Sequence, residues 1–175
     1  MTDDLRKYLQ EIKKTNDLIV IKKKVSTKYE IASITEKLDG SKAVLFENIK
    51  GSKFKLVSNL VGNRSRFMQA IGSKKSDSNQ KILRAISSAK KPKISTNAKF
   101  FENSSKDISI RPTVTHFQNE SGPFITSSIL YTQNQEKKSQ NSSIHRLMPI
   151  GKNQFSIRMV EGRDLHRTFM FAKNQ

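Results

Sequence analysis

The spacing of the apolar residues changes partway along the chain, and this change constrains the fold more than any other feature. Up to about residue 90, apolar residues recur at helical intervals, as between Leu5 and Ile12, and short apolar runs such as 18–21 separate these stretches. From Ser109 onward, runs of β-favouring residues predominate. The sequence therefore predicts an α+β protein, in which a mixed α/β region precedes a β-rich one.

Local signals place the individual elements. The first helix is expected to be capped by Asp3 or Asp4, the second to end before Gly40, the third to follow Asn63, and the fourth to reach Ala89. In the first half, strands are expected at 18–21, 43–49 and 54–61, with the last two paired. In the second half, β runs are expected at 112–117, 124–132, 143–150 and 154–160, with an exposed hairpin loop at 133–141 and a helix at 163–170.

The composition of the chain predicts where these two regions meet. Residues 1–95 are expected to form an amino-terminal mixed α/β domain. A polar stretch rich in Lys, Ser and Asn follows, and residues 96–108 are expected to be a linker. Residues 109–175 are expected to form a second, β-rich domain.

Composition also limits the classes of function. The formal net charge of +18 favours anionic partners, but the basic residues are mostly lysines spread along the chain, so a specific nucleic-acid site is not expected. The absence of cysteine excludes disulfides and thiolate chemistry. The start of the chain lacks a signal-peptide pattern, and no apolar run is long enough to cross a membrane, so a cytoplasmic protein is expected.

Three histidines and one arginine are candidates for metal binding or catalysis before any resemblance is considered. The three histidines, His116, His145 and His166, form no recognisable metal-binding motif, and taken singly each is more often structural. Strand alternation would put Ile144 and Arg146 on one face of the 143–150 strand, with Ser143, His145 and Leu147 on the other. An arginine that points into a barrel interior requires an anion, whereas one at a solvated rim does not.

The order of several segments resembles a known family. The run LFENIKGSKF at 45–54 is followed by SNLVGNRSR at 58–66, and later by RPTVTHFQNESGPFITSSILYT and NSSIHRLMPIGKNQFSIRMVEGRDLHR. Together these resemble the amino-terminal domain of the UbiD decarboxylases and the opening of their flavin-binding split β-barrel. The resemblance implies that residues 109–175 are the first, incomplete part of that barrel.

The resemblance also implies cofactors and roles. Members of the family use prenylated FMN (prFMN) and Mn²⁺, with K⁺ nearby. Asn141 and His166 match two protein ligands of the metal that bridges to the prFMN phosphate. Arg146 matches the catalytic arginine that lies beside the flavin and the substrate carboxylate. Three further residues match positions that line the flavin: Thr126, Ser143 and Ile144. The residue before the metal-binding histidine is often polar in the family but is Leu165 here, and the spacing from Arg146 is slightly stretched.

The implied reaction is a non-oxidative decarboxylation of a small carboxylic acid. The short segments around Arg146 and His166 look archaeal, which implies anhydromevalonate phosphate as substrate and isopentenyl phosphate as product; the alternative is a polyprenyl-4-hydroxybenzoate of quinone biosynthesis. A flavin prenyltransferase would supply the cofactor, and the full-length protein would be a homo-oligomer. The family's catalytic glutamates have no counterpart in these residues, so the chain alone is expected to be inactive. A basic nucleic-acid-binding module and a non-catalytic scaffold subunit are the alternatives of other classes.

Overall fold

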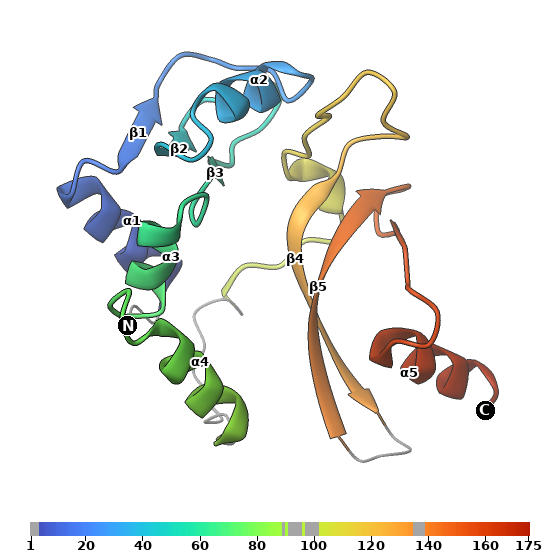
Figure 1. The fold of residues 1–175 in the computed structure, drawn as a ribbon. Coiled ribbons are helices and arrows are strands. Elements are labelled where there is room, and N and C mark those ends of the chain that lie inside the picture. Colours follow the sequence, from blue (N-terminus) through green and yellow to red (C-terminus); the bar gives the residue numbers. More distant parts are fainter. Residues whose placement is uncertain (1–3, 89, 91–95, 97–101, 135–138) are drawn as a thin grey trace. The chain divides into compact units, whose positions relative to one another are not determined.

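The computed structural model describes residues 4–88, 90, 96, 102–134 and 139–175. The chain forms two units, Met1–Ser105 and Lys106–Gln175, shown in Figure 1. The first combines helices with a small sheet, and the second is built on a long β-hairpin with one terminal helix. The α+β class expected from the sequence is therefore confirmed.

The first unit contains a three-stranded sheet in the order β1-β2-β3. β1 (Leu18–Ile21) runs parallel to β2 (Ala43–Phe46), because α2 (Glu30–Lys37) connects them as a crossover. β3 (Leu56–Ser58) returns antiparallel to β2, so the expected pairing of these two segments is confirmed. β2 and β3 are shorter than the runs expected at 43–49 and 54–61.

The remaining helices of this unit are α1 (Leu5–Lys14), α3 (Arg64–Ala70) and α4 (Ser78–Ser87). Asp4 caps α1 by accepting a hydrogen bond from the backbone N–H of Arg6 at 2.6 Å. The apolar face of α1 buries Tyr8 and Ile12 against Leu18 and other residues of the sheet. Burial of this face, rather than helix propensity alone, stabilises so short a helix.

Arg66 on α3 is the largest fully buried side chain among the described residues. Its guanidinium donates only to backbone carbonyls: Nη1 to Ser41 at 2.5 Å, Nη2 to Asn59 at 3.0 Å and Nε to Leu60 at 3.2 Å. Tyr8 Oη in turn donates to the carbonyl of Arg66 at 2.8 Å. These bonds tie α1, α3 and the segments beside the sheet into one body.

The second unit contains an antiparallel sheet in the order β4-β5-β6. β4 (Ile125–Asn134) and β5 (Ser139–Pro149) form a long hairpin, and β6 (Phe155–Ile157) pairs with the end of β5. A short 3₁₀ helix, η2 (Ile108–Ile110), precedes the hairpin, and α5 (Asp164–Lys173) packs against β4 and β5. Among the residues that the structure describes, these three strands do not close into a barrel.

Several expected elements differ from the structure. The run at 112–117 is not a strand, because only isolated bridges at Val114 and Thr115 pair it, the first of them with Phe124. The run at 154–160 pairs only at β6. The strands of the hairpin extend to Asn134 and from Ser139, so they include part of the loop expected at 133–141. Residues 135–138, Asp3, Ala89 and residues 97–101 of the expected linker at 96–108 lie outside the described residues.

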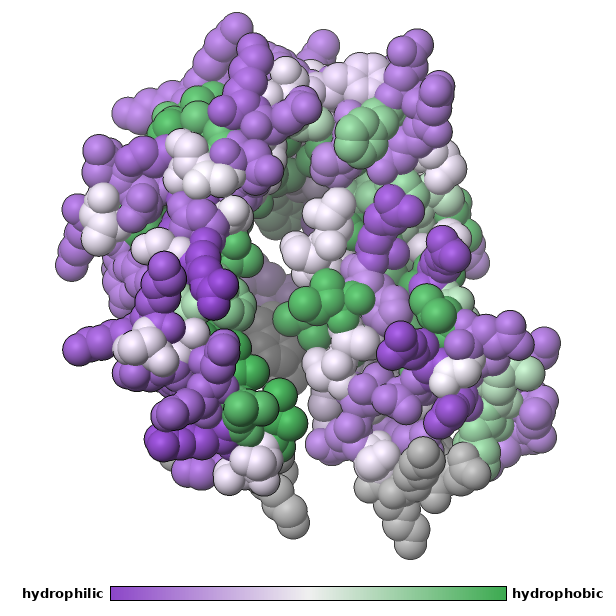
Figure 2. Space-filling view, viewed as in Figure 1, coloured by the Kyte–Doolittle hydropathy of each residue, from purple (hydrophilic) through white to green (hydrophobic). Residues whose placement is uncertain are grey.

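Apolar side chains remain exposed in both units. On α4, Leu83 is 65% and Ile86 is 72% exposed, and on the β4–β5 hairpin Ile129 is 71% exposed. Figure 2 shows hydrophobic areas over α4 and over the hairpin within a largely hydrophilic surface. In the described part of the chain, no helix is both long enough and apolar enough to cross a membrane.

Candidate functional site

The two faces of β5 differ in exposure, and this separates the predicted site residues into two groups. Ile144 and Arg146 are exposed, whereas Asn141, Ser143 and His145 are half-buried. The alternation predicted for this strand is therefore confirmed. One face of β5 presents an arginine and an isoleucine, and the other presents small polar side chains.

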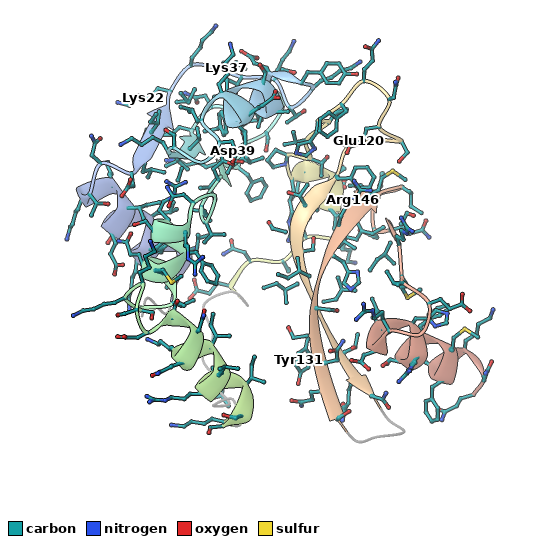
Figure 3. The ribbon with its side chains drawn as sticks, in the orientation of Figure 1. Lys22, Lys37, Asp39, Glu120, Tyr131 and Arg146 are labelled. Carbon is teal, nitrogen blue, oxygen red and sulfur yellow. The ribbon has the colours of Figure 1, made fainter. Side chains whose placement is uncertain are left out.

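Arg146 lies beside a loop formed by residues 114–124, which we call the 114–124 loop. Its guanidinium carbon is 4.4 Å from the centre of the Phe124 ring, within the range of a cation–π contact. Its Nη1 is 4.0 Å from Oε1 of Glu120, and the two residues are labelled in Figure 3. The Arg146 side chain is 61% exposed and that of Glu120 is 8% exposed. A buried carboxylate thus faces an arginine that remains accessible to a ligand.

Glu120 is itself fixed by the loop. Its Oε2 accepts a hydrogen bond from the backbone N–H of His116 at 2.8 Å and lies 3.7 Å from the Nδ1 of the same histidine. We call Arg146, Glu120, His116 and Phe124 the arginine site. Sequence reasoning did not find Glu120 or Phe124, although an isolated acid just before a strand in so basic a chain was an available signal.

A β-bulge lies directly opposite Arg146. Ile125 pairs with Leu147 and Ser128 pairs with His145, so Thr126 and Ser127 together occupy the position across from Arg146. Bulges re-aim side chains and often lie beside functional sites. The structure therefore brings Thr126, a predicted flavin-lining residue, next to Arg146 in the sheet.

An exposed apolar strip continues from Arg146 along the hairpin. Ile144 pairs with Ile129, and they are 74% and 71% exposed. Tyr131, two residues further along β4, is 61% exposed and is labelled in Figure 3. A flat apolar surface with an arginine at one end suits a ligand that is partly aromatic and partly anionic.

The half-buried face of β5 holds a different set of groups. Asn141 pairs with Thr132 across the hairpin. The hydroxyl of Thr132 is buried and has no hydrogen-bond partner among the described residues. Ser143 and His145 are joined by a hydrogen bond of 3.0 Å between Oγ and Nε2. The unsatisfied hydroxyl marks a place where a further polar group would be favourable.

His166 lies in the first turn of α5, the helix that packs against β4 and β5. Its Nδ1 accepts a hydrogen bond of 3.3 Å from the backbone N–H of Gly162. Gly162 adopts a φ of +75°, which an L-residue rarely adopts, and this turn sets the start of the helix.

The predicted metal ligands fit a metal in kind but not in number. An amide oxygen from Asn141 and an imidazole nitrogen from His166 are both suitable donors for Mn²⁺. However, no three His, Asp or Glu side chains gather around one point among the residues that the structure describes. A metal held here would therefore need further donors, such as phosphate oxygens of a bound cofactor.

Comparison with known proteins agrees with this architecture. The family model described as the 3-octaprenyl-4-hydroxybenzoate carboxy-lyase N-terminal domain matches residues 9–86. The model described as the Rift-related domain of the same carboxy-lyase matches residues 87–175. These are domains of UbiD-class carboxy-lyases. The chain belongs to the UbiD family.

Solved structures share the fold. The UbiD-class enzyme HmfF from Pelotomaculum thermopropionicum, in complex with FMN, matches 97% of this chain with a TM-score of 0.92 and 27% identity. An evolved dimeric form of HmfF, in complex with prFMN, matches 99% of this chain with a TM-score of 0.88 and 26% identity. The chain spans only 39% and 42% of the lengths of these two structures.

Two curated relatives match a shorter part of the chain. The anhydromevalonate phosphate decarboxylase of Methanothermobacter thermautotrophicus is 33% identical over 54 residues, which are 31% of this chain and 13% of that protein. The enzyme of the same name from Methanosarcina mazei is 37% identical over 57 residues, which are 33% of this chain and 13% of that protein.

Proposed function

We propose that this chain forms the cofactor-binding part of a prFMN-dependent decarboxylase, and that the substrate is anhydromevalonate phosphate, which would lose CO₂ to give isopentenyl phosphate. Membership of a carboxy-lyase family supports the type of reaction. The two archaeal relatives support the substrate. The observation that carries the proposal is Arg146, an accessible arginine beside a buried glutamate and at the end of an exposed apolar strip.

Some residues of the chain would bind the cofactor and its metal, and Arg146 would orient the substrate. Arg146 would hold the substrate carboxylate through its planar pair of N–H donors. Thr126 and Ile144 would line the flavin from the exposed face, and Ser143 would line it from the other. Asn141 and His166 would hold Mn²⁺ together with the flavin phosphate, with K⁺ nearby.

The reaction breaks one carbon–carbon bond. The carboxylate leaves as CO₂, the electron pair remains on the carbon that carried it, and this carbon then takes up a proton. When bound, prFMN would hold the negative charge that develops on that carbon. Arg146 would keep the carboxylate aligned until the bond breaks. The family's acid–base glutamates have no counterpart in these residues, so turnover would require residues outside this chain.

A polyprenyl-4-hydroxybenzoate is the second candidate substrate. The descriptions of both matching family models name a 3-octaprenyl-4-hydroxybenzoate carboxy-lyase, and this observation favours it. Both substrates carry a carboxylate that Arg146 could bind. They differ in the remainder of the molecule, which is a phosphate on one and a long apolar chain on the other.

The experiment is to produce the protein with a flavin prenyltransferase and Mn²⁺, with any continuation of the chain included. The visible spectrum, the metal content and CO₂ release from anhydromevalonate phosphate would be measured for the wild type and for Arg146→Ala. Arg158→Ala is the matched control, because Arg158 is an exposed arginine of the same unit. We expect bound prFMN in all three proteins and loss of CO₂ release in Arg146→Ala alone.

Other outcomes would change the proposal in defined ways. Flavin binding without CO₂ release would move the substrate to prenylated hydroxybenzoates. Equal turnover in the Arg146→Ala and Arg158→Ala proteins would remove Arg146 from the mechanism. Failure to bind either flavin or metal would refute the decarboxylase assignment. Salt-sensitive binding of nucleic acid, or a stable complex with a second chain that carries the catalytic glutamates, would then identify a binding module or a scaffold.

A further inference from the structure

Arg146 cannot hold a fixed orientation by itself. An arginine side chain that is 61% exposed samples many rotamers, and holding it in one of them costs conformational entropy. A group that aligns a reacting carboxylate must nevertheless stay in place, because a misplacement of about 1 Å can cost on the order of a hundredfold in rate. Neighbouring groups must therefore supply the restraint.

Glu120 can supply this restraint. Its side chain is 8% exposed, and a carboxylate removed from water to this extent is costly unless hydrogen bonds or a cation compensate it. One oxygen is anchored by the backbone N–H of His116 at 2.8 Å, and the other faces Arg146 Nη1 at 4.0 Å. In the described part of the chain, Arg146 forms an ion pair with no other acid. The charge of Glu120 therefore stabilises one orientation of the guanidinium.

The 114–124 loop holds both Glu120 and Phe124 in place. The backbone N–H of Phe124 donates to the carbonyl of Val114 at 2.9 Å, which closes the loop at its base. The backbone N–H of Glu120 donates to the carbonyl of Phe117 at 3.3 Å, which forms a turn within it. The loop thus places the Phe124 ring 4.4 Å from the guanidinium carbon and the Glu120 carboxylate 4.0 Å from Nη1.

We propose that Glu120 is a positioning residue for Arg146: it holds one edge of the guanidinium, so that the remaining N–H groups are presented to a substrate carboxylate. The consequence for catalysis rests on the proposed function. Glu120 touches neither substrate nor cofactor in this scheme, and it acts through Arg146 alone. His116 contributes through its backbone N–H, which orients the Glu120 carboxylate.

Glu120→Gln is the decisive variant, because a glutamine can still accept the hydrogen bond from His116 but carries no charge. The first measurement needs no catalysis. In ¹⁵N–¹H NMR spectra of the chain, Arg146→Lys identifies the Arg146 Nε–H signal. We expect this signal to be separate from those of mobile arginines in the wild type and to merge with them in Glu120→Gln, while the His116 amide signal is retained. Glu161→Gln, which alters an exposed acid of the same unit, should leave the Arg146 signal unchanged.

The second measurement is steady-state decarboxylation by the catalytically complete protein. We expect Glu120→Gln to lower kcat on the order of tenfold to a hundredfold, with KM changed less than about threefold, because alignment is lost while the cation remains. An unchanged Arg146 signal in Glu120→Gln would overturn the positioning role, and an unchanged kcat would overturn its catalytic consequence. Absence of decarboxylation in the wild type would instead refute the proposed function, while the NMR result would still decide whether Glu120 orients Arg146.

Discussion

The buried Arg66 should be indispensable to the first unit, and Arg66→Met tests this directly. The methionine fills a similar volume but donates no hydrogen bonds, so the carbonyls of Ser41, Asn59 and Leu60 would each lose a donor. Ser41 is exposed and its carbonyl can bond to water, whereas Asn59 and Leu60 are half-buried. Asn59 keeps a hydrogen bond from the backbone N–H of Gly62, and Leu60 keeps one from Tyr8 Oη, so the loss is that of the bonds to the guanidinium itself. A hydrogen bond to a charged group contributes about 1.5–3 kcal/mol, so losing the two at Asn59 and Leu60 gives a loss of about 3–6 kcal/mol.

The loss of stability should be readily measurable. In a domain of 60–100 residues, each 1 kcal/mol lowers Tm by roughly 4–8 °C, so a loss of about 3 kcal/mol corresponds to a decrease of at least 12 °C or so. Urea unfolding would be followed by hydrogen exchange in peptides from β1 and β2, so that the first unit is observed separately. Arg64→Met on the same helix is the control, because Arg64 is exposed.

A stability loss below about 1 kcal/mol in Arg66→Met would refute this reasoning. It would mean that the cost of burying the arginine charge offsets nearly all that its hydrogen bonds contribute, as replacement of some buried ion pairs by apolar residues has shown. A loss of equal size in Arg64→Met would also refute it, since the effect would then belong to α3 in general.

Two further predictions concern the packing of each unit. Burial raises the pKa of Tyr8, and the nearby Arg66 partly opposes this shift, so the native state favours the protonated phenol. Its stabilising effect should be complete below about pH 10 and lost as pH rises through the raised pKa; Tyr8→Phe should remove this dependence in unfolding measured from pH 8 to 11. In the second unit, a Cβ on Gly122 would lie 2.9 Å from Met148 Sδ. Gly122→Ala should therefore lower Tm, and adding Met148→Ala should recover most of the loss, as double-mutant unfolding curves would show.

The sequence predicted the parts of the fold that depend on local pattern. Asp4 capping α1, the burial of Tyr8 and Ile12 on one helix face, and the alternation along β5 all follow from spacings within a single element. The run at 112–117 shows where this reasoning fails. Its residues favour a strand, but a strand requires a continuous partner, and within this run only Val114 and Thr115 form isolated bridges. Partners are a property of the tertiary structure.

The candidate site was predictable to a similar extent. Family resemblance singled out Arg146, and strand alternation placed it on the same face as Ile144. Neither could show that Glu120 lies beside Arg146, because β4 and most of β5 separate the two residues in the sequence. Its contact with Arg146 depends on the register of β4 with β5 and on the bridge that closes the 114–124 loop. The spacing of residues within one segment does not predict such long-range contacts.

Under the proposed function, the two faces of β5 would serve two different parts of a flavin site. Asn141 and Ser143 lie on the half-buried face, beside the unsatisfied hydroxyl of Thr132, where polar groups of a cofactor would find partners. Arg146 lies beyond them on the exposed face, at the β-bulge. A bulge increases the local twist of a strand and so re-aims the side chains around it. In the proposed function, the irregularity at Thr126 and Ser127 would therefore help to aim Arg146 at the substrate while Asn141 and Ser143 contact the cofactor from the other face of β5.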